Sequence, residues 1–164
     1  MKTVKTYAFP VLLILACCTV WYWQHALASL PYLPVNEVVP LAVLTPLLLV
    51  LTFAASFSLL KTCKTPRPVR RALLSTAAML AIVLVQGVFF LSFLTYRFAA
   101  PLPAPRLPDW PVSIVTCIVA TLCAAHLTGL LIYGLAKQKT PVRHRLPALL
   151  GWLLLNLCLA LLTV

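Results

Sequence analysis

Acidic residues are nearly absent from this chain of 164 residues. Glu37 and Asp109 stand against 13 lysine and arginine residues, so the formal net charge is +11. No Asp, Glu, Lys or Arg lies within any of the five long apolar stretches of the sequence. Ionisable residues inside the membrane are the usual mark of proton relays, voltage sensors and ion-coupled carriers. Their absence argues against these classes of membrane protein.

Motifs of catalysis and of nucleotide binding are also missing. Membrane enzymes need acid, base or metal residues near the membrane interface, and the two acidic residues fall in short loops. No C-x-x-C occurs, and none of the six cysteines lies in a predicted outer loop: Cys17, Cys18, Cys63, Cys117, Cys123 and Cys158. Buried cysteine usually acts as a small hydrophobic residue. We therefore predict no disulfide framework, no enzymatic activity and no cofactor.

Apolar residues dominate what remains. Hydrophobic residues make up 63% of the chain and charged residues 9%. Runs of about 20 apolar residues are typical of membrane-spanning helices. We predict an all-α fold, a polytopic integral membrane bundle of five transmembrane helices. It forms one domain over residues 1–164, with spans at about 7–30, 40–60, 72–96, 111–135 and 147–164.

The basic loop from Lys61 to Arg71, with five cations and two prolines, sets the predicted orientation. Short basic loops stay on the cytoplasmic side. With a cytoplasmic N-terminus, 11 of the 13 lysine and arginine residues fall inside, and only Arg97 and Arg106 fall outside. We predict a cytoplasmic N-terminus and an outside C-terminus, in a cell inner membrane. Because the cations serve as topology signals, we expect no nucleic-acid partner, and we expect attraction to anionic lipid headgroups on the cytoplasmic side.

Polar residues inside the spans suggest one contact between helices. His126 and Asn156 both lie about 14 Å from the inner face at 1.5 Å per residue. Their helices are joined by a short loop and should be antiparallel neighbours. We predict a hydrogen bond between the two side chains, worth about 0.6 kcal/mol in membrane helices. His25 lies at a different depth from His126, which disfavours a haem held by both.

We expect no metal site, and the alternative is a site for a soft metal ion. Cys123 lies three residues before His126 on the same helical face. Cys158 lies about 17 Å from the inner face by the same rise per residue. Thiolate and imidazole at similar depth suit Cu(I) or Zn(II). The alternative ligand set is therefore Cys123, His126 and Cys158.

Small residues recur every four positions in the fourth span. We call Cys117, Thr121, Ala125 and Gly129 the small-residue stripe. Small side chains let another helix approach closely within a membrane. The second outer loop, between the third and fourth spans, carries four prolines and should be stiff. Both features favour contact with other membrane protein subunits.

An internal repeat is a further interpretation of the sequence. Lys64-Thr65-Pro66 reappears as Lys139-Thr140-Pro141, and each is followed by an arginine-rich stretch and Ala-Leu-Leu. A duplication would relate residues 1–68 to residues 69–143. The shared composition of apolar helices is the competing explanation.

Three functions are compatible with these observations. The first is a non-catalytic subunit or accessory protein of a membrane complex, indicated by the small-residue stripe and the lack of a charged site in the membrane. The second is a small transporter or soft-metal-handling membrane protein. The third is an immunity-type protein that acts against a pore-forming toxin.

Overall fold

The computed structural model describes the backbone of residues 2–29, 38–99, 110–138 and 142–162, and the side chains of 8–25, 43–88, 114–138 and 143–162. The described part is all-helical, and its five helices are long and apolar enough to cross a membrane. This confirms the predicted all-α class and number of apolar helices. They are α1 (Lys2–Ser29), α2 (Val38–Thr62), α3 (Pro68–Ala99), α4 (Trp110–Lys137) and α5 (Val142–Leu162).

Two helices begin earlier than the hydropathy of the sequence predicts. α3 begins at Pro68 rather than near residue 72, and α5 begins at Val142 rather than at Pro147. A hydropathy boundary marks the edge of the apolar region, whereas a helix continues as long as its backbone bonds are made. Pro68 is well placed at the first position of α3, since its missing N–H would have no partner there. The first turn of α3 therefore carries the cations that were expected in a loop.

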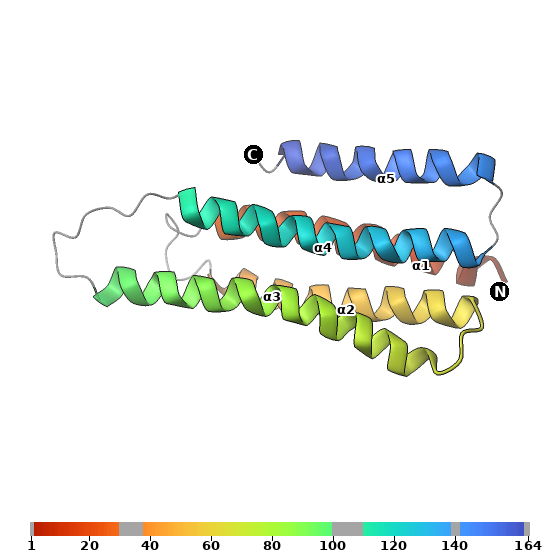
Figure 1. Cartoon of the computed structure of the whole chain (residues 1–164), viewed down its shortest axis with the longest axis horizontal. Helices are drawn as coiled ribbons and strands as arrows, with labels where there is room; N and C mark the ends of the chain where they lie inside the picture. Colours follow the sequence, from red (N-terminus) through yellow and green to blue (C-terminus); the bar gives the residue numbers. More distant parts are fainter. Residues whose placement is uncertain (1, 30–37, 100–109, 139–141, 163–164) are drawn as a thin grey trace.

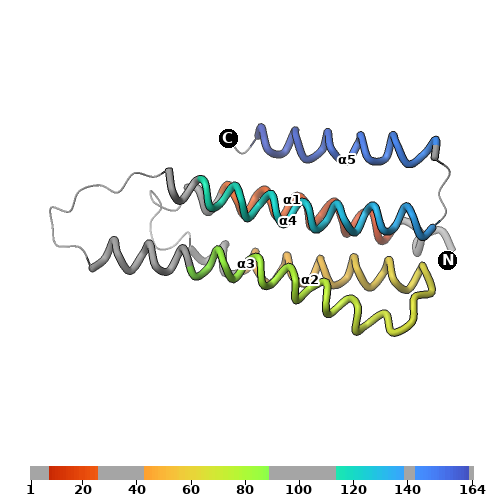
Figure 2. Tube along the Cα trace, in the orientation of Figure 1, coloured from red at the N-terminus to blue at the C-terminus, as the bar shows by residue number. Residues whose placement is uncertain are grey.

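Four helices form a bundle, and the fifth lies outside it (Figures 1 and 2). α1 packs against α2 and α4, and α3 packs against the same two helices. Bulky side chains from all four helices fill the centre and are fully buried, among them Leu13, Leu48, Met79 and Leu127. α5 packs more loosely against α1 and α4.

The turn between α2 and α3 ends α2 with two characteristic hydrogen bonds. The Thr65 N–H donates to the Leu60 carbonyl at 3.0 Å, and the Lys64 N–H donates to the Lys61 carbonyl at 3.2 Å. This is the Schellman arrangement, in which the residue after the helix takes a left-handed conformation. Lys64 has that conformation with φ 49°, although glycine is the usual residue there. The chain therefore turns back within a few residues, at the same end of the bundle as the start of α1 (Figure 1).

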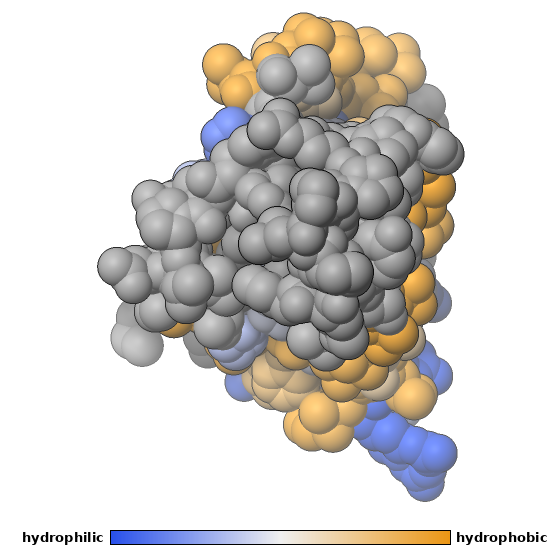
Figure 3. Space-filling model, turned by 90° about the vertical axis from the view of Figure 1, so that its left-hand side faces the viewer, coloured by the Kyte–Doolittle hydropathy of each residue, from blue (hydrophilic) through white to orange (hydrophobic). Residues whose placement is uncertain are grey.

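Apolar side chains cover the sides of the bundle. Figure 3 shows hydrophobic surface around the margin, beyond the residues drawn in grey. α5 contributes much of it: within residues 143–162 Trp152 is the one buried side chain, while Leu153, Leu154 and Leu157 are exposed. Lipid tails are as apolar as leucine, so such a surface is satisfied within a bilayer.

Some predicted features fall outside the described residues. These are Glu37, Asp109, the four prolines of the second outer loop, and the second Lys-Thr-Pro signature at residues 139–141. The internal repeat relating residues 1–68 to 69–143 therefore stays a prediction.

Candidate functional site

The small-residue stripe of α4 faces outward. Cys117, Thr121, Ala125 and Gly129 are all exposed. A Cβ atom added to Gly129 would meet nothing within 4 Å, so open space lies beside this glycine. At one end of the stripe, the Cys117 sulfur accepts a hydrogen bond from Gln24 Nε2 of α1 at 3.4 Å. The rest of the stripe has no side-chain bond to another helix among the described residues.

A different face of α4 packs inside the bundle. Its side chains Val119, Ala120, Cys123 and Leu127 are buried, with exposed fractions of at most 2%. Gly134 continues this face, where an added Cβ would lie 3.0 Å from Leu59 Cδ1 and 3.1 Å from Phe9 Cε1. The spacing of three and four residues among these positions is the signal of a buried helical face.

The structure gives His126 and Asn156 different partners, which corrects the predicted hydrogen bond between them. His126 Nε2 lies 2.9 Å from Ser75 Oγ of α3. Asn156 Oδ1 accepts hydrogen bonds from the Cys17 thiol at 3.3 Å and from Trp21 Nε1 at 3.1 Å, both on α1. The two residues thus tie different pairs of helices together.

The physical reason is rotation about the helix axis. α4 contacts α5 through Thr128, whose hydroxyl accepts a 2.8 Å hydrogen bond from Trp152 Nε1. His126 lies two residues earlier, which is about 200° around the helix at 3.6 residues per turn. It therefore faces α3 rather than α5. Rise per residue predicts depth but carries no information on which neighbour a side chain meets.

His126 belongs to a polar cluster that joins three helices. The Ser56 hydroxyl of α2 donates to Ser75 Oγ at 3.1 Å, and Ser75 in turn contacts His126. A serine hydroxyl beside an imidazole can be activated as a nucleophile. Acyl transfer also needs hydrogen-bond donors that stabilise the oxyanion. Ser75 lies inside α3, where the backbone N–H groups are used by the helix. The cluster is therefore arranged to hold helices together.

The alternative metal ligands do not come together. Cys123 is buried inside the bundle, His126 contacts Ser75, and Cys158 is exposed on α5. No group of three or more His, Cys, Asp or Glu side chains able to hold a metal ion occurs in the part of the chain that the structure describes. The observed positions give the soft-metal alternative no ligand set.

Two buried glutamines, Gln24 and Gln86, also bond to a neighbouring helix, and the sequence alone predicted no role for them. Gln86 Nε2 of α3 donates to Thr116 Oγ1 of α4 at 3.1 Å, next to the Gln24–Cys117 contact. The Oε1 atoms of Gln24 and Gln86 are buried without a hydrogen-bond partner among the described residues. Polar side chains in membrane helices commonly bond across to a neighbouring helix. The sequence signal for these contacts was a polar glutamine within an apolar stretch.

Comparison with protein-family models, with curated proteins and with solved structures finds no match to this chain. The class that the fold defines is a small all-helical protein with five helices able to span a membrane. Any more specific function must be argued from the residues themselves.

Proposed function

We propose that this chain is a non-catalytic subunit or accessory protein of a membrane complex. In this proposal a transmembrane helix of another protein packs against the small-residue stripe of α4. The protein lies in the inner membrane of a bacterial cell, with its N-terminus in the cytoplasm and its C-terminus outside. The positive-inside rule supports this orientation, because the ends of α2 and α4 and the starts of α1, α3 and α5, which carry most of the cations, share one end of the bundle (Figure 1).

The outward direction of the small-residue stripe carries the proposal. Helices associate in lipid through close packing, and small residues at the contact let the two backbones approach. Thr121, Ala125 and Gly129 are exposed, and Gly129 has open space beside it. Apart from Cys117, which bonds to Gln24 of α1, the stripe lies away from the buried face with which α4 packs in the bundle. Packing against a partner helix gives them a role.

The polar contacts support a non-catalytic role. Several of them join two or three helices of the same chain, as in Ser56–Ser75–His126 and Thr128–Trp152. None places a nucleophile or base beside an exposed backbone donor in the described helices. This arrangement is suited to a stable scaffold.

The test compares three glycines that have equal space but different positions. Gly129, Gly87 and Gly151 are all exposed, and an added Cβ meets nothing within 4 Å at any of them. Gly129→Leu should therefore fold normally but block the partner. Native mass spectrometry of complexes extracted from the host should show a defined complex whose population falls about tenfold in Gly129→Leu, equivalent to about 1.4 kcal/mol.

Gly87→Leu on α3 and Gly151→Leu on α5 are the matched controls, and both should retain the complex. A bare chain in the unsubstituted protein would contradict the proposal, as would equal losses in all three variants. The orientation has its own test, since a reporter fused after Val164 should be active only outside the cytoplasm. Activity only in the cytoplasm would reverse the proposed topology.

A further inference from the structure

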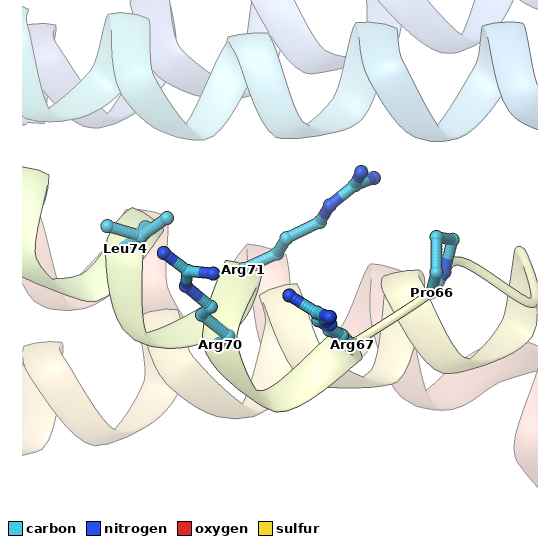
Figure 4. A pocket seen from close by; sticks show the side chains of 5 residues that line it. All are labelled: Pro66, Arg67, Arg70, Arg71 and Leu74. Carbon is cyan, nitrogen blue, oxygen red and sulfur yellow. The ribbon is translucent and has the colours of Figure 1, made fainter.

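Three arginines line one pocket at the start of α3. The pocket has a volume of about 470 Å³ and is lined by Pro66, Arg67, Arg70, Arg71 and Leu74 (Figure 4). Arg70 and Arg71 each lie three or four positions from both Arg67 and Leu74, so the four residues share one side of the helical turn. Arg67 directly precedes α3 and has a left-handed backbone conformation with φ 54°. The tight turn after α2 thus places three arginine side chains around the same hollow, with their guanidinium groups pointing in different directions (Figure 4).

The positive charge of this pocket has no internal counter-charge. Arg67, Arg70 and Arg71 are exposed, and their guanidinium groups form no hydrogen bond or ion pair within the described residues. The chain has only two acidic residues, and both lie outside those described. Three adjacent cations repel one another unless an anion sits between them. An anion bound among these arginines would relieve their repulsion, while the apolar part of the lining would suit an alkyl chain.

Arginine favours one kind of anion in particular. Its planar guanidinium group presents paired N–H donors that match two oxygens of a phosphate or a carboxylate. Phosphate carries enough oxygen atoms for several guanidinium groups to bind the same group. The chemistry of the pocket thus points to a phosphate group.

The surroundings of the pocket indicate where that phosphate comes from. Pro66 and Leu74 add apolar walls, and Val69 and Leu73 beside them are at least half exposed. The membrane-spanning stretch of α3 begins at Pro68, so the pocket lies where the apolar surface starts. We propose that it binds the phosphate of an anionic phospholipid, whose headgroup meets the arginines while its acyl chains lie along α3. This inference is independent of the partner proposed for α4.

The test is lipid binding by the purified, delipidated full chain. Native mass spectrometry would follow titration with phosphatidylglycerol, and with zwitterionic phosphatidylcholine for comparison. The unsubstituted protein should prefer phosphatidylglycerol. Replacing all three arginines by glutamine should weaken phosphatidylglycerol binding about 100-fold, since each cation near a membrane surface contributes roughly fivefold.

A matched variant removes the same charge elsewhere. Lys137, Arg143 and Arg145 lie near the junction of α4 and α5 and do not line the pocket. Replacing them by glutamine should leave phosphatidylglycerol binding within about twofold, since salt screens attraction between exposed charges that do not contact the lipid. Equal losses in the two triple variants would mean diffuse attraction and would overturn the pocket. Unchanged binding after loss of the three pocket arginines would overturn it as well.

A third variant guards against altered membrane orientation, since the glutamine substitutions remove cations that direct insertion. Replacing Arg67, Arg70 and Arg71 by lysine keeps the charge but removes the paired donors, so binding should weaken about tenfold. Binding equal to the unsubstituted protein would show that charge alone acts, which contradicts a built phosphate site. Millimolar inorganic phosphate should not displace the lipid; displacement would assign the pocket to a soluble phosphate compound and overturn the lipid assignment.

Discussion

Two faces of α4 carry small residues, but they have opposite surroundings. Gly134 is buried, and its neighbours Leu59 Cδ1 and Phe9 Cε1 would lie 3.0 and 3.1 Å from an added Cβ. Gly129 is exposed and has nothing within 4 Å of an added Cβ. Gly134 and Gly129 are five positions apart. Packing of the bundle requires glycine at Gly134 but not at Gly129.

The comparison shows how a membrane helix divides its roles. On the buried face, small residues such as Ala120 and Cys123 alternate with bulky Leu127, because the neighbouring helices fill the remaining space. On the stripe, four small residues recur every four positions, and open space lies beside Gly129. Close packing is a main source of helix association in lipid, and both faces are suited to it. The bundle occupies one face of α4 and leaves the other exposed, and we propose that a partner helix packs there.

The largest effect should come from filling the buried position. Gly134→Leu forces a side chain into space held by Leu59 and Phe9, and overpacking of this kind costs about 1–3 kcal/mol. Gly129→Leu should change the unfolding free energy by less than about 0.5 kcal/mol, as is usual for exposed positions. Reversible unfolding in mixed micelles would measure both variants. Equal destabilisation would erase the distinction between the two faces.

The fold was largely predictable because the bilayer leaves few choices. Backbone groups in lipid must be paired within the segment, so a long apolar stretch becomes a helix. The five apolar stretches and five helices agree for this reason. The first residues of α3 and α5 were less predictable, since Pro68 and Val142 lie in polar sequence where hydropathy does not indicate a helix start. The bonds of the turn after α2 determine where α3 starts.

The contacts within the bundle were only half predictable. The depth of a residue in the membrane follows from counting residues along its helix. This count placed His126 and Asn156 at the same depth. Rotation follows from how all the helices pack, and successive residues point about 100° apart, so a small error changes the partner. Gln24 and Gln86 were visible as polar residues in apolar sequence, but their partners Cys117 and Thr116 depend on that same packing.

A medium effect is expected where α4 meets α5. Trp152→Phe removes the 2.8 Å hydrogen bond to Thr128, which joins a loosely packed helix to the bundle. Hydrogen bonds between membrane helices contribute about 0.6 kcal/mol on average and about 1.7 at most. Hydrogen exchange should become faster throughout α5 and stay unchanged in α2. Leu154→Phe, at an exposed position of α5, is the control. Unchanged exchange in α5 would show that Trp152 does not anchor it.

The smallest effect separates the observed contact of His126 from the predicted one. A double-mutant cycle of His126→Leu with Ser75→Ala should give a coupling of about 0.6 kcal/mol, because their side chains meet at 2.9 Å. The cycle of His126→Leu with Asn156→Leu should give a coupling near zero, since Asn156 bonds to Cys17 and Trp21 of α1. Unfolding in mixed micelles would supply both cycles. A coupling to Asn156 instead of Ser75 would mean that α4 is rotated toward α5, and the exposed stripe would then turn toward the bundle.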